Sequence, residues 1–123
     1  MARLACVSNS DGRAEEALEA AGVRAGLEFV VDSHLVGFEK PDPRIFRLAL
    51  EGLGVPAERA LYVGDIRSID ELGARAAGMR FALIDPWMDY GDPEISIPAI
   101  RELPYWITTN FGLPAPKAGV KDD

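Results

Sequence analysis

The chain has 123 residues, of which 48% are hydrophobic and 27% are charged, and its formal net charge at pH 7 is −7. This length fits one domain that can bury a hydrophobic core. The acidic balance excludes the basic surface with which nucleic-acid-binding domains usually contact phosphates. The sequence shows neither an apolar run of the roughly 20 residues that span a bilayer nor the pattern of a secretory signal. We therefore expect a cytoplasmic protein that binds neither nucleic acid nor a membrane.

Four short apolar stretches predict the strands of a parallel sheet. They lie at residues 4–8, 29–33, 60–64 and 81–85. Each is apolar on both faces, as expected for strands that helices cover on both sides. The segments between them, residues 13–21, 43–53 and 69–77, have apolar side chains three or four positions apart, which predicts helices. The alternation predicts a doubly wound, Rossmann-like α/β fold with helices on both faces of the sheet.

The predicted helices carry recognisable start and stop signals. Asp42 followed by Pro43 is typical of a helix N-cap and first turn, and Ser68 with Glu71 fits a capping box. Glycine is favoured just beyond the end of a helix. Three glycines follow the predicted helices at such positions: Gly22, Gly54 and Gly78.

The pattern loosens from Pro86 onward. Residues 87–98 are predicted to form a long loop that holds one more short strand, and residues 99–107 a final helical turn. Residues 114–123 are expected to be a mobile tail. Because no linker or internal repeat divides the chain, we expect residues 1–113 to form a single α/β core.

Polar side chains gather where the predicted strands end. Ser8 and Asn9 follow the first strand, Asp65 and Asp70 follow the third, and Lys40 lies in the loop before the second helix. In open parallel sheets, ligands bind beyond the carboxyl ends of the strands. A hydroxyl, an ammonium group and two carboxylates at that edge suit a phosphoryl group beside Mg²⁺, which prefers one or two carboxylates plus water and phosphate oxygens. A divalent ion would also explain why two acids are tolerated together.

Each of these residues also has a simpler explanation. Asp65 and Asp70 could serve only as caps, because the dipole at a helix amino terminus favours carboxylates. Ser8 and Asn9 could form a turn, and Lys40 could be a solvated loop charge. The spacing of the residues does not by itself decide between these structural roles and a site.

Two other kinds of side chain are assigned to packing rather than to chemistry. Cys6 is the only cysteine, so it cannot form an internal disulfide, and we expect a small buried apolar side chain. Three aromatic residues are expected to pack in the core or in loops: Tyr62, Trp87 and Trp106.

Three stretches resemble motifs two, three and four of the haloacid dehalogenase-like (HAD) hydrolase superfamily: ACVSNSDG, GFEKPDPRIFRLALEGLGV and LYVGDIRSIDELGARAAGM. The resemblance covers residues 4 to about 86 and is closest to the phosphoglycolate-phosphatase-like branch. It implies a Rossmann-like fold and Mg²⁺-dependent hydrolysis of a small phosphate ester through an aspartyl-phosphate intermediate.

The resemblance also implies a role for each candidate site residue. Ser8 would bind the transferring phosphoryl group, with Asn9 beside it, and Lys40 would neutralise charge between nucleophile and phosphate. Asp65 would hold Mg²⁺, and Asp70 would ligate or orient the ion. Ser8 and Lys40 are thus the expected catalytic residues, and Asp65 and Asp70 the expected metal ligands.

The resemblance breaks down at the first motif of the family, D-x-D, which supplies the nucleophile and the general acid and base. This chain contains no D-x-D segment, and Asp32 and Asp85 end other strands, where they cannot attack in line. Enzymes of this type can accelerate hydrolysis by up to about 10²¹-fold, whereas one donor such as Lys40 supplies about 10²- to 10³-fold. We expect the carboxy-terminal segment of a phosphohydrolase, inactive alone and with weak or no Mg²⁺ binding.

The missing motif also affects the predicted sheet. In the family the first strand lies between the strands of motifs two and four, so the resemblance implies a sheet without its central strand and without the usual helical cap. Residues 4–8 and 60–64 would then present unpaired apolar edges, which attract another strand. We expect either that these strands close up or that a homodimer partner or a separate amino-terminal segment fills the gap.

Two other functions are compatible with parts of the pattern. One is a non-catalytic HAD-like dimerisation or interaction module that keeps its acids as caps. The other is a phospho-receiver domain, which is also doubly wound and built on acids plus a lysine. A receiver has its acidic pair after the first strand and its lysine after the last, whereas Lys40 here precedes Asp65. Element order therefore disfavours the receiver.

Overall fold

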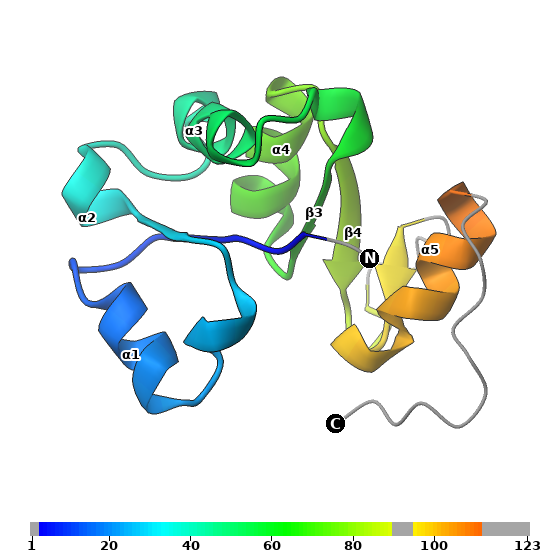
Figure 1. The fold of residues 1–123 in the computed structure, drawn as a ribbon. Helices are drawn as coiled ribbons and strands as arrows, with labels where there is room; N and C mark the ends of the chain where they lie inside the picture. The colour runs from blue at the N-terminus through cyan, green and yellow to red at the C-terminus, as the bar shows by residue number, and fades with distance from the viewer. Residues whose placement is uncertain (1–2, 90–94, 112–123) are drawn as a thin grey trace.

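The computed structural model describes residues 3–89 and 95–111, which form short strands connected by helices (Figure 1). In chain order the strands are β1 (Cys6–Ser8), β2 (Val30–Asp32), β3 (Leu61–Gly64), β4 (Arg80–Ile84) and β5 (Ser96–Ile97). The α-helices are α1 (Ala14–Ala20), α2 (Ser33–Val36), α3 (Pro43–Leu53), α4 (Leu72–Ala76) and α5 (Leu103–Phe111). Short 3₁₀ segments η1 (Arg24–Gly26), η2 (Ala57–Arg59) and η4 (Ile100–Glu102) and the π-helical segment η3 (Arg67–Glu71) complete the described part.

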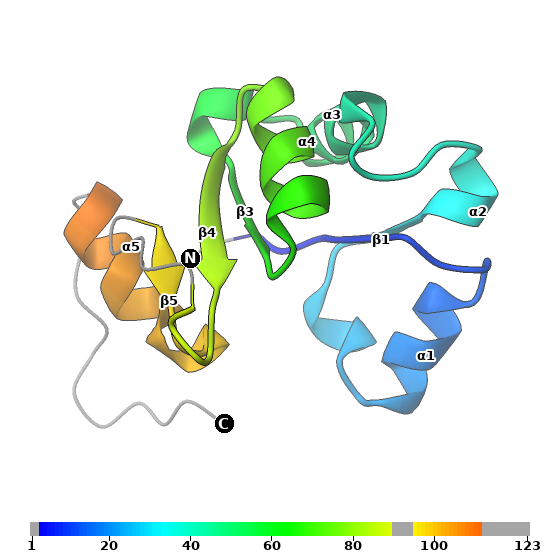
Figure 2. The same ribbon diagram turned by 180° about the vertical axis from the view of Figure 1, so that it is seen from behind.

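The strands form two separate parallel sheets. β1 pairs with β2, and β4 pairs with both β3 and β5. In Figure 1, β1 crosses the view whereas β3 and β4 run from top to bottom, and Figure 2 shows the same arrangement from behind. Helix α1 lies on one side of the β1–β2 ribbon and α3 on the other in both views. This mixture of parallel strands and helices confirms the predicted fold class.

β1 and β3 belong to different sheets and do not pair, and this break between the two sheets is called the gap. Within residues 3–89 and 95–111 no strand lies between the two, and they do not close up into one sheet. The N–H of Cys6 donates to the carbonyl oxygen of Phe29 at 3.2 Å, so the backbone groups of Val7 face the opposite, open edge. There the carbonyl oxygen of Val7 accepts a hydrogen bond from the Tyr62 hydroxyl at 3.3 Å. Of the two alternatives, direct closure of the strands into one sheet is therefore wrong.

Helix α3 provides the centre of the core. Ile45 and Phe46 on this helix have 0% of their surface exposed, and Leu83 on β4 is equally buried. These residues form one hydrophobic cluster with Ala74 of α4 and Phe81 of β4. The cluster holds α3 and α4 against the three-stranded sheet, which fixes the loops that precede α3 and follow β3.

The start and stop signals of the helices are largely confirmed. The Asp42 side chain accepts the N–H of Arg44 at 2.9 Å, so α3 begins at Pro43 and spans the predicted residues. Gly54 follows its last residue with a φ of 68°. Gly22 and Gly78 have φ values of 77° and 83° just beyond α1 and α4, the left-handed region that glycine enters without strain.

The predicted capping box of Ser68 and Glu71 is wrong. Residues 67–71 form the π-helical segment η3, and its N-cap makes no side-chain hydrogen bond. Glu71 instead accepts from Arg67 at 2.6 Å and from Arg75 at 2.8 Å. The backbone N–H groups that open this turn are bound by Asp70, so no serine is needed as a cap.

The part of the chain after β4 follows the prediction in outline. β5 is the short strand expected within residues 87–98, whereas η4 and α5 together are longer than the single helical turn expected. The predicted mobile tail, residues 114–123, lies outside the described residues. Trp87 is 83% exposed and does not pack as predicted, and Cys6 is half-buried. In the described ranges no helix has the length and apolar content needed to cross a membrane.

The close approach of α4 to α3 requires glycine at position 73. A Cβ at Gly73 would collide with the Phe46 ring and lie 2.8 Å from the carbonyl oxygen of Pro41. We expect Gly73→Ala to lower the free energy of unfolding by about 1–3 kcal/mol, the usual cost of overpacking a core, as measured by urea denaturation. Gly26→Ala is the matched control, because a Cβ there meets nothing within 4 Å. Equal losses in both variants would contradict the packing explanation.

Candidate functional site

The five predicted site residues lie at the carboxyl ends of β1 and β3 and in the loop before α3. Ser8 is the last residue of β1, Asp65 directly follows β3, and Asp70 lies in η3. The structure joins Asn9, Lys40 and Asp70 in one hydrogen-bonded network. Among the described residues, the side chains of Ser8 and Asp65 have no hydrogen-bond partner.

A buried ion pair between Lys40 and Asp70 is the centre of this network. Lys40 Nζ lies 2.8 Å from Asp70 Oδ1, and the two side chains keep only 13% and 5% of their surface exposed. Burial disfavours the charged ammonium, but its hydrogen bonds to Asp70 and to the Tyr62 hydroxyl outweigh this and raise the pKa of Lys40. At neutral pH the lysine is therefore a fixed cation.

Asn9 fixes the backbone of Lys40 from the β1 side. Its amide nitrogen donates to the carbonyl oxygen of Lys40 at 3.0 Å, and its amide oxygen accepts from the Lys40 N–H at 2.8 Å. Asn9 thus positions Lys40 in this structure. The amide nitrogen has a second N–H, and the contact of Asn9 with a phosphate stays a prediction.

The two acids after β3 have different surroundings. Asp70 Oδ2 accepts the N–H groups of Asp65 at 3.1 Å and Ile66 at 3.0 Å, while Oδ1 binds Lys40. Gly64 permits this approach, because a Cβ there would lie 2.5 Å from the Asp70 side chain. Asp65 is exposed to solvent. The charge of the buried Asp70 carboxylate is balanced by Lys40 and by two N–H donors, and the charge of Asp65 is solvated. The two acids can therefore lie close together without a metal ion between them.

The donor set for Mg²⁺ is incomplete. Within residues 3–89 and 95–111, no group of three aspartate, glutamate, histidine or cysteine side chains could hold a metal ion. Both oxygens of Asp70 are occupied, which leaves the carboxylate of Asp65. Mg²⁺ needs octahedral oxygen ligands, part of which are usually water and phosphate. The described residues therefore cannot complete a Mg²⁺ site without further ligands. The metal roles of Asp65 and Asp70 stay predictions.

Tyr62 belongs to the network although its sequence position indicated packing only. Its ring does pack as expected, with its centroid 4.8 Å from that of Phe46 and 6.5 Å from that of Phe81. Its hydroxyl, however, accepts a hydrogen bond from Lys40 Nζ at 3.0 Å. One feature of the sequence could have indicated this role: Tyr62 places a hydroxyl within an apolar strand that is followed by an acid. Buried tyrosine hydroxyls usually have a hydrogen-bond partner.

Asp32 is a second polar residue whose role the sequence did not reveal. It is 2% exposed and accepts three backbone N–H groups, at 3.1, 3.0 and 3.0 Å, from Gly12, Ala14 and His34. Burial opposes its ionisation, but these three donors outweigh that effect and lower the pKa of Asp32. The carboxylate ties the loop after β1 to the start of α2, which stabilises the segment that carries Asn9.

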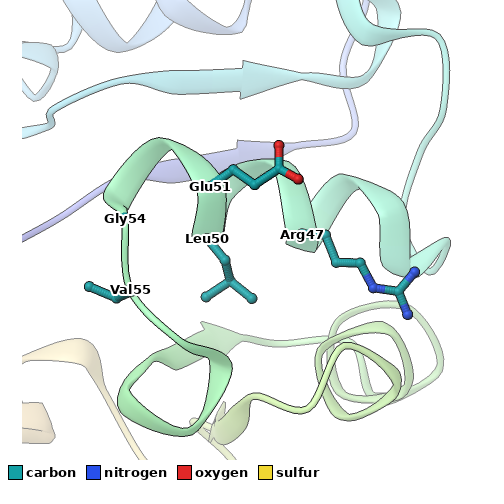
Figure 3. A pocket seen from close by; sticks show the side chains of 5 residues that line it. All are labelled: Arg47, Leu50, Glu51, Gly54 and Val55. Carbon is teal, nitrogen blue, oxygen red and sulfur yellow. The ribbon is translucent and has the colours of Figure 1, made fainter.

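The hollows found on the described surface are shallow. One hollow has a volume of about 340 Å³, and two of its lining residues, Ser10 and Glu39, are chain neighbours of Asn9 and Lys40. The hollow is lined by Ser10, Ser33, His34, Gly37, Phe38 and Glu39. Another of about 420 Å³ lies along the end of α3 (Figure 3), with a lining of Arg47, Leu50, Glu51, Gly54 and Val55. Neither is lined by a predicted site residue, so neither encloses the candidate site.

Comparisons with known proteins agree on one family. The profile of the haloacid dehalogenase-like hydrolases matches residues 1–78. The chain is 40% identical over 100 residues to haloacid dehalogenase-like hydrolase domain-containing protein 3 of Bos taurus, a match over 81% of this chain and 38% of that protein. It is 44% identical over 81 residues to the phosphoserine phosphatase of Thermus thermophilus, over 66% of this chain and 32% of the relative.

The fold is also similar to solved structures. The HAD phosphatase from Thermococcus onnurineus matches with a TM-score of 0.78 and 30% identity, over 84% of this chain and 49% of that one. The chain spans about a third of the length of the curated relatives it matches. The similarity therefore concerns one part of those longer proteins.

Loss of one partner should expose the importance of the Lys40–Asp70 pair. We expect Asp70→Asn to lower the free energy of unfolding by about 3 kcal/mol, because the lysine charge stays buried without its counter-ion. Urea denaturation at pH 7 measures the change. Asp11→Asn is the control, since the Arg13–Asp11 pair is 76% and 64% exposed and such pairs contribute less than about 1 kcal/mol. A loss in Asp70→Asn no larger than in the control would refute the central role of the pair.

Proposed function

This chain belongs to the haloacid dehalogenase-like hydrolase family, and from that premise we propose that it provides the phosphate-binding part of a Mg²⁺-dependent phosphohydrolase for a small phosphate ester. The observation that carries the proposal is the buried ammonium of Lys40, held near the end of β1 by Asn9 and Asp70. A fixed cation stabilises the charge of a phosphoryl group during its transfer. Similarity to a phosphatase named for phosphoserine supports a small phosphorylated substrate.

Each residue has a distinct part in this proposal. Ser8 donates a hydrogen bond to a phosphoryl oxygen, and Lys40 neutralises the charge of that group. Asn9 positions Lys40 and offers its second N–H to the phosphate. Asp65 would be the direct ligand of Mg²⁺, whereas Asp70 orients Lys40 and the backbone of Asp65. When bound, the metal ion would neutralise phosphoryl oxygens and orient the ester.

Turnover requires more than these residues. The chain has no D-x-D segment, and it corresponds to about a third of its curated relatives. Covalent catalysis needs a nucleophile in line with the leaving group. We propose that this nucleophile comes from a segment outside the 123 residues and that activity belongs to the longer protein.

The purified 123-residue chain should therefore release no more phosphate from p-nitrophenyl phosphate than its Asp65→Asn variant does. It should nevertheless bind Mg²⁺ and inorganic phosphate together in the millimolar range. Binding to the native state stabilises it by about 1.4 kcal/mol at ten times Kd, which a thermal melt detects as a rise in Tm.

Matched variants make the binding test specific. Ser8→Ala should reduce the rise in Tm with Mg²⁺ and phosphate, whereas Ser68→Ala, which changes an exposed serine in η3, should leave it intact. Metal-dependent hydrolysis that Asp65→Asn abolishes would contradict the proposed inactivity. Melting curves of the wild-type chain that do not respond to saturating Mg²⁺ and phosphate would count against the phosphate site.

The open strand edges favour a second candidate function, a non-catalytic dimerisation or interaction module. The N–H of Val7 faces the gap, and no residue in the described ranges accepts it. Free edge groups of this kind pair with another strand. Asp70 also binds the backbone N–H groups of Asp65 and Ile66. Such a structural role for the acid is what a non-catalytic module predicts. The strand that enters would come from a second copy of the chain or from a separate segment.

Sedimentation velocity distinguishes this assembly from a monomer. If a second copy pairs at the open edge, the wild-type chain should sediment as a dimer, and Val7→Pro should dissociate it because the free N–H is removed. Val7→Ala keeps that N–H and serves as the control. A folded wild-type monomer at every concentration tested would exclude the homodimer.

A further inference from the structure

We propose that Tyr62 is a positioning residue of the candidate site, because its hydroxyl holds the Lys40 ammonium and ties β3 to the open edge of β1. The inference rests on the proposed function only for the anion-binding role of Lys40. The position of the ammonium group itself is a property of the chain that can be measured without any substrate.

The ring of Tyr62 is fixed by its neighbours. Phe46 meets it edge-on, with centroids 4.8 Å apart and an interplanar angle of 73°, and Phe81 stacks at 6.5 Å and 13°. These two phenylalanines are core residues with 0% and 2% of their surface exposed. Close-packed interiors leave such rings little freedom. The location of the Tyr62 hydroxyl is therefore determined by the hydrophobic core.

The Tyr62 hydroxyl bridges the two sheets. A tyrosine hydroxyl both donates and accepts, and this one accepts from Lys40 Nζ at 3.0 Å and donates to the carbonyl oxygen of Val7 at 3.3 Å. In the described part of the chain this is the only hydrogen bond between a residue of β1 and a residue of β3. The hydroxyl thus locates the ammonium relative to both sheets.

The geometry of the ammonium group explains why a second acceptor matters. Lys40 Nζ has three N–H donors, of which Asp70 and Tyr62 accept two, at 2.8 Å and 3.0 Å. No residue in the described ranges accepts the third. Two fixed acceptors determine the direction of the remaining N–H, which is then available to an anion. With Asp70 alone, the ammonium could rotate about its single hydrogen bond.

The experiment measures the titration of Lys40 by NMR in protein labelled with ¹³C-lysine. The chain has only two other lysines, Lys117 and Lys121, so few lysine signals have to be assigned. In the wild-type chain, the hydrogen bonds to Asp70 and Tyr62 should make Lys40 titrate above the usual range of a lysine side chain. Tyr62→Phe keeps the ring and removes the hydroxyl, so the Lys40 midpoint should fall, because the ammonium loses one of its two acceptors.

Tyr105→Phe, which removes a hydroxyl from α5, should leave the Lys40 midpoint unchanged. A purely structural role of Tyr62 would lower the stability of the variant without moving the midpoint in the folded protein. An unchanged midpoint in folded Tyr62→Phe would therefore overturn the proposal. If that variant does not fold, the wild-type chain still provides a test: the Tyr62 hydroxyl proton should exchange slowly, and fast exchange would overturn the proposal.

This outcome is separable from that of the proposed function. If the Lys40 midpoint falls in Tyr62→Phe but the wild-type chain does not bind phosphate, Tyr62 is a positioning residue and the proposed phosphate site is wrong. Phosphate binding with an unshifted midpoint would retain the site and reject the role of Tyr62.

Discussion

A buried cation needs fixed partners, and the ion pair of Lys40 with Asp70 is the interaction on which the rest of this site depends. Removing an ammonium and a carboxylate from water costs several kcal/mol for each ion, and the pair compensates only when its other hydrogen-bonding positions are filled. Here the Tyr62 hydroxyl and two backbone N–H groups after β3 fill these positions, except for the third N–H of Lys40. The partners come from β3, η3 and the loop before α3, so the pair connects segments that the core positions.

The same interaction explains how two acids coexist at the end of β3. Both carboxylate oxygens of Asp70 accept hydrogen bonds that balance its charge. The Asp65 side chain is exposed to solvent and takes no part in the ion pair. Asp70 thus has a structural role whether or not a metal ion binds. Asp70 binds the backbone N–H of Asp65, but no described residue binds the Asp65 side chain, and this is why the proposed metal chemistry is centred on Asp65.

The gap in the sheet and the candidate site share one atom. The carbonyl oxygen of Val7 faces the open edge of β1 and accepts the Tyr62 hydroxyl, which in turn binds Lys40. A strand that entered the gap in register would require the same carbonyl oxygen as an acceptor. Completion of the sheet and placement of the ammonium are therefore coupled, which gives the two proposed functions a common physical basis.

Motifs in the sequence indicated the family by resemblance. The sequence by itself also determined the main strands and helices, their order and the edge at which the candidate residues gather. These follow from local signals: apolar runs, helical periodicity, the Asp42 cap and the glycines after each helix. The tertiary structure decided which polar groups meet, because Lys40 lies 30 residues from Asp70 and Val7 lies 55 residues from Tyr62. The capping box failed for the same reason, since Asp70 bound the backbone groups that a local pattern assigned to Ser68. Spacing along a chain cannot show which of two carboxylates is buried, because burial depends on how distant segments pack.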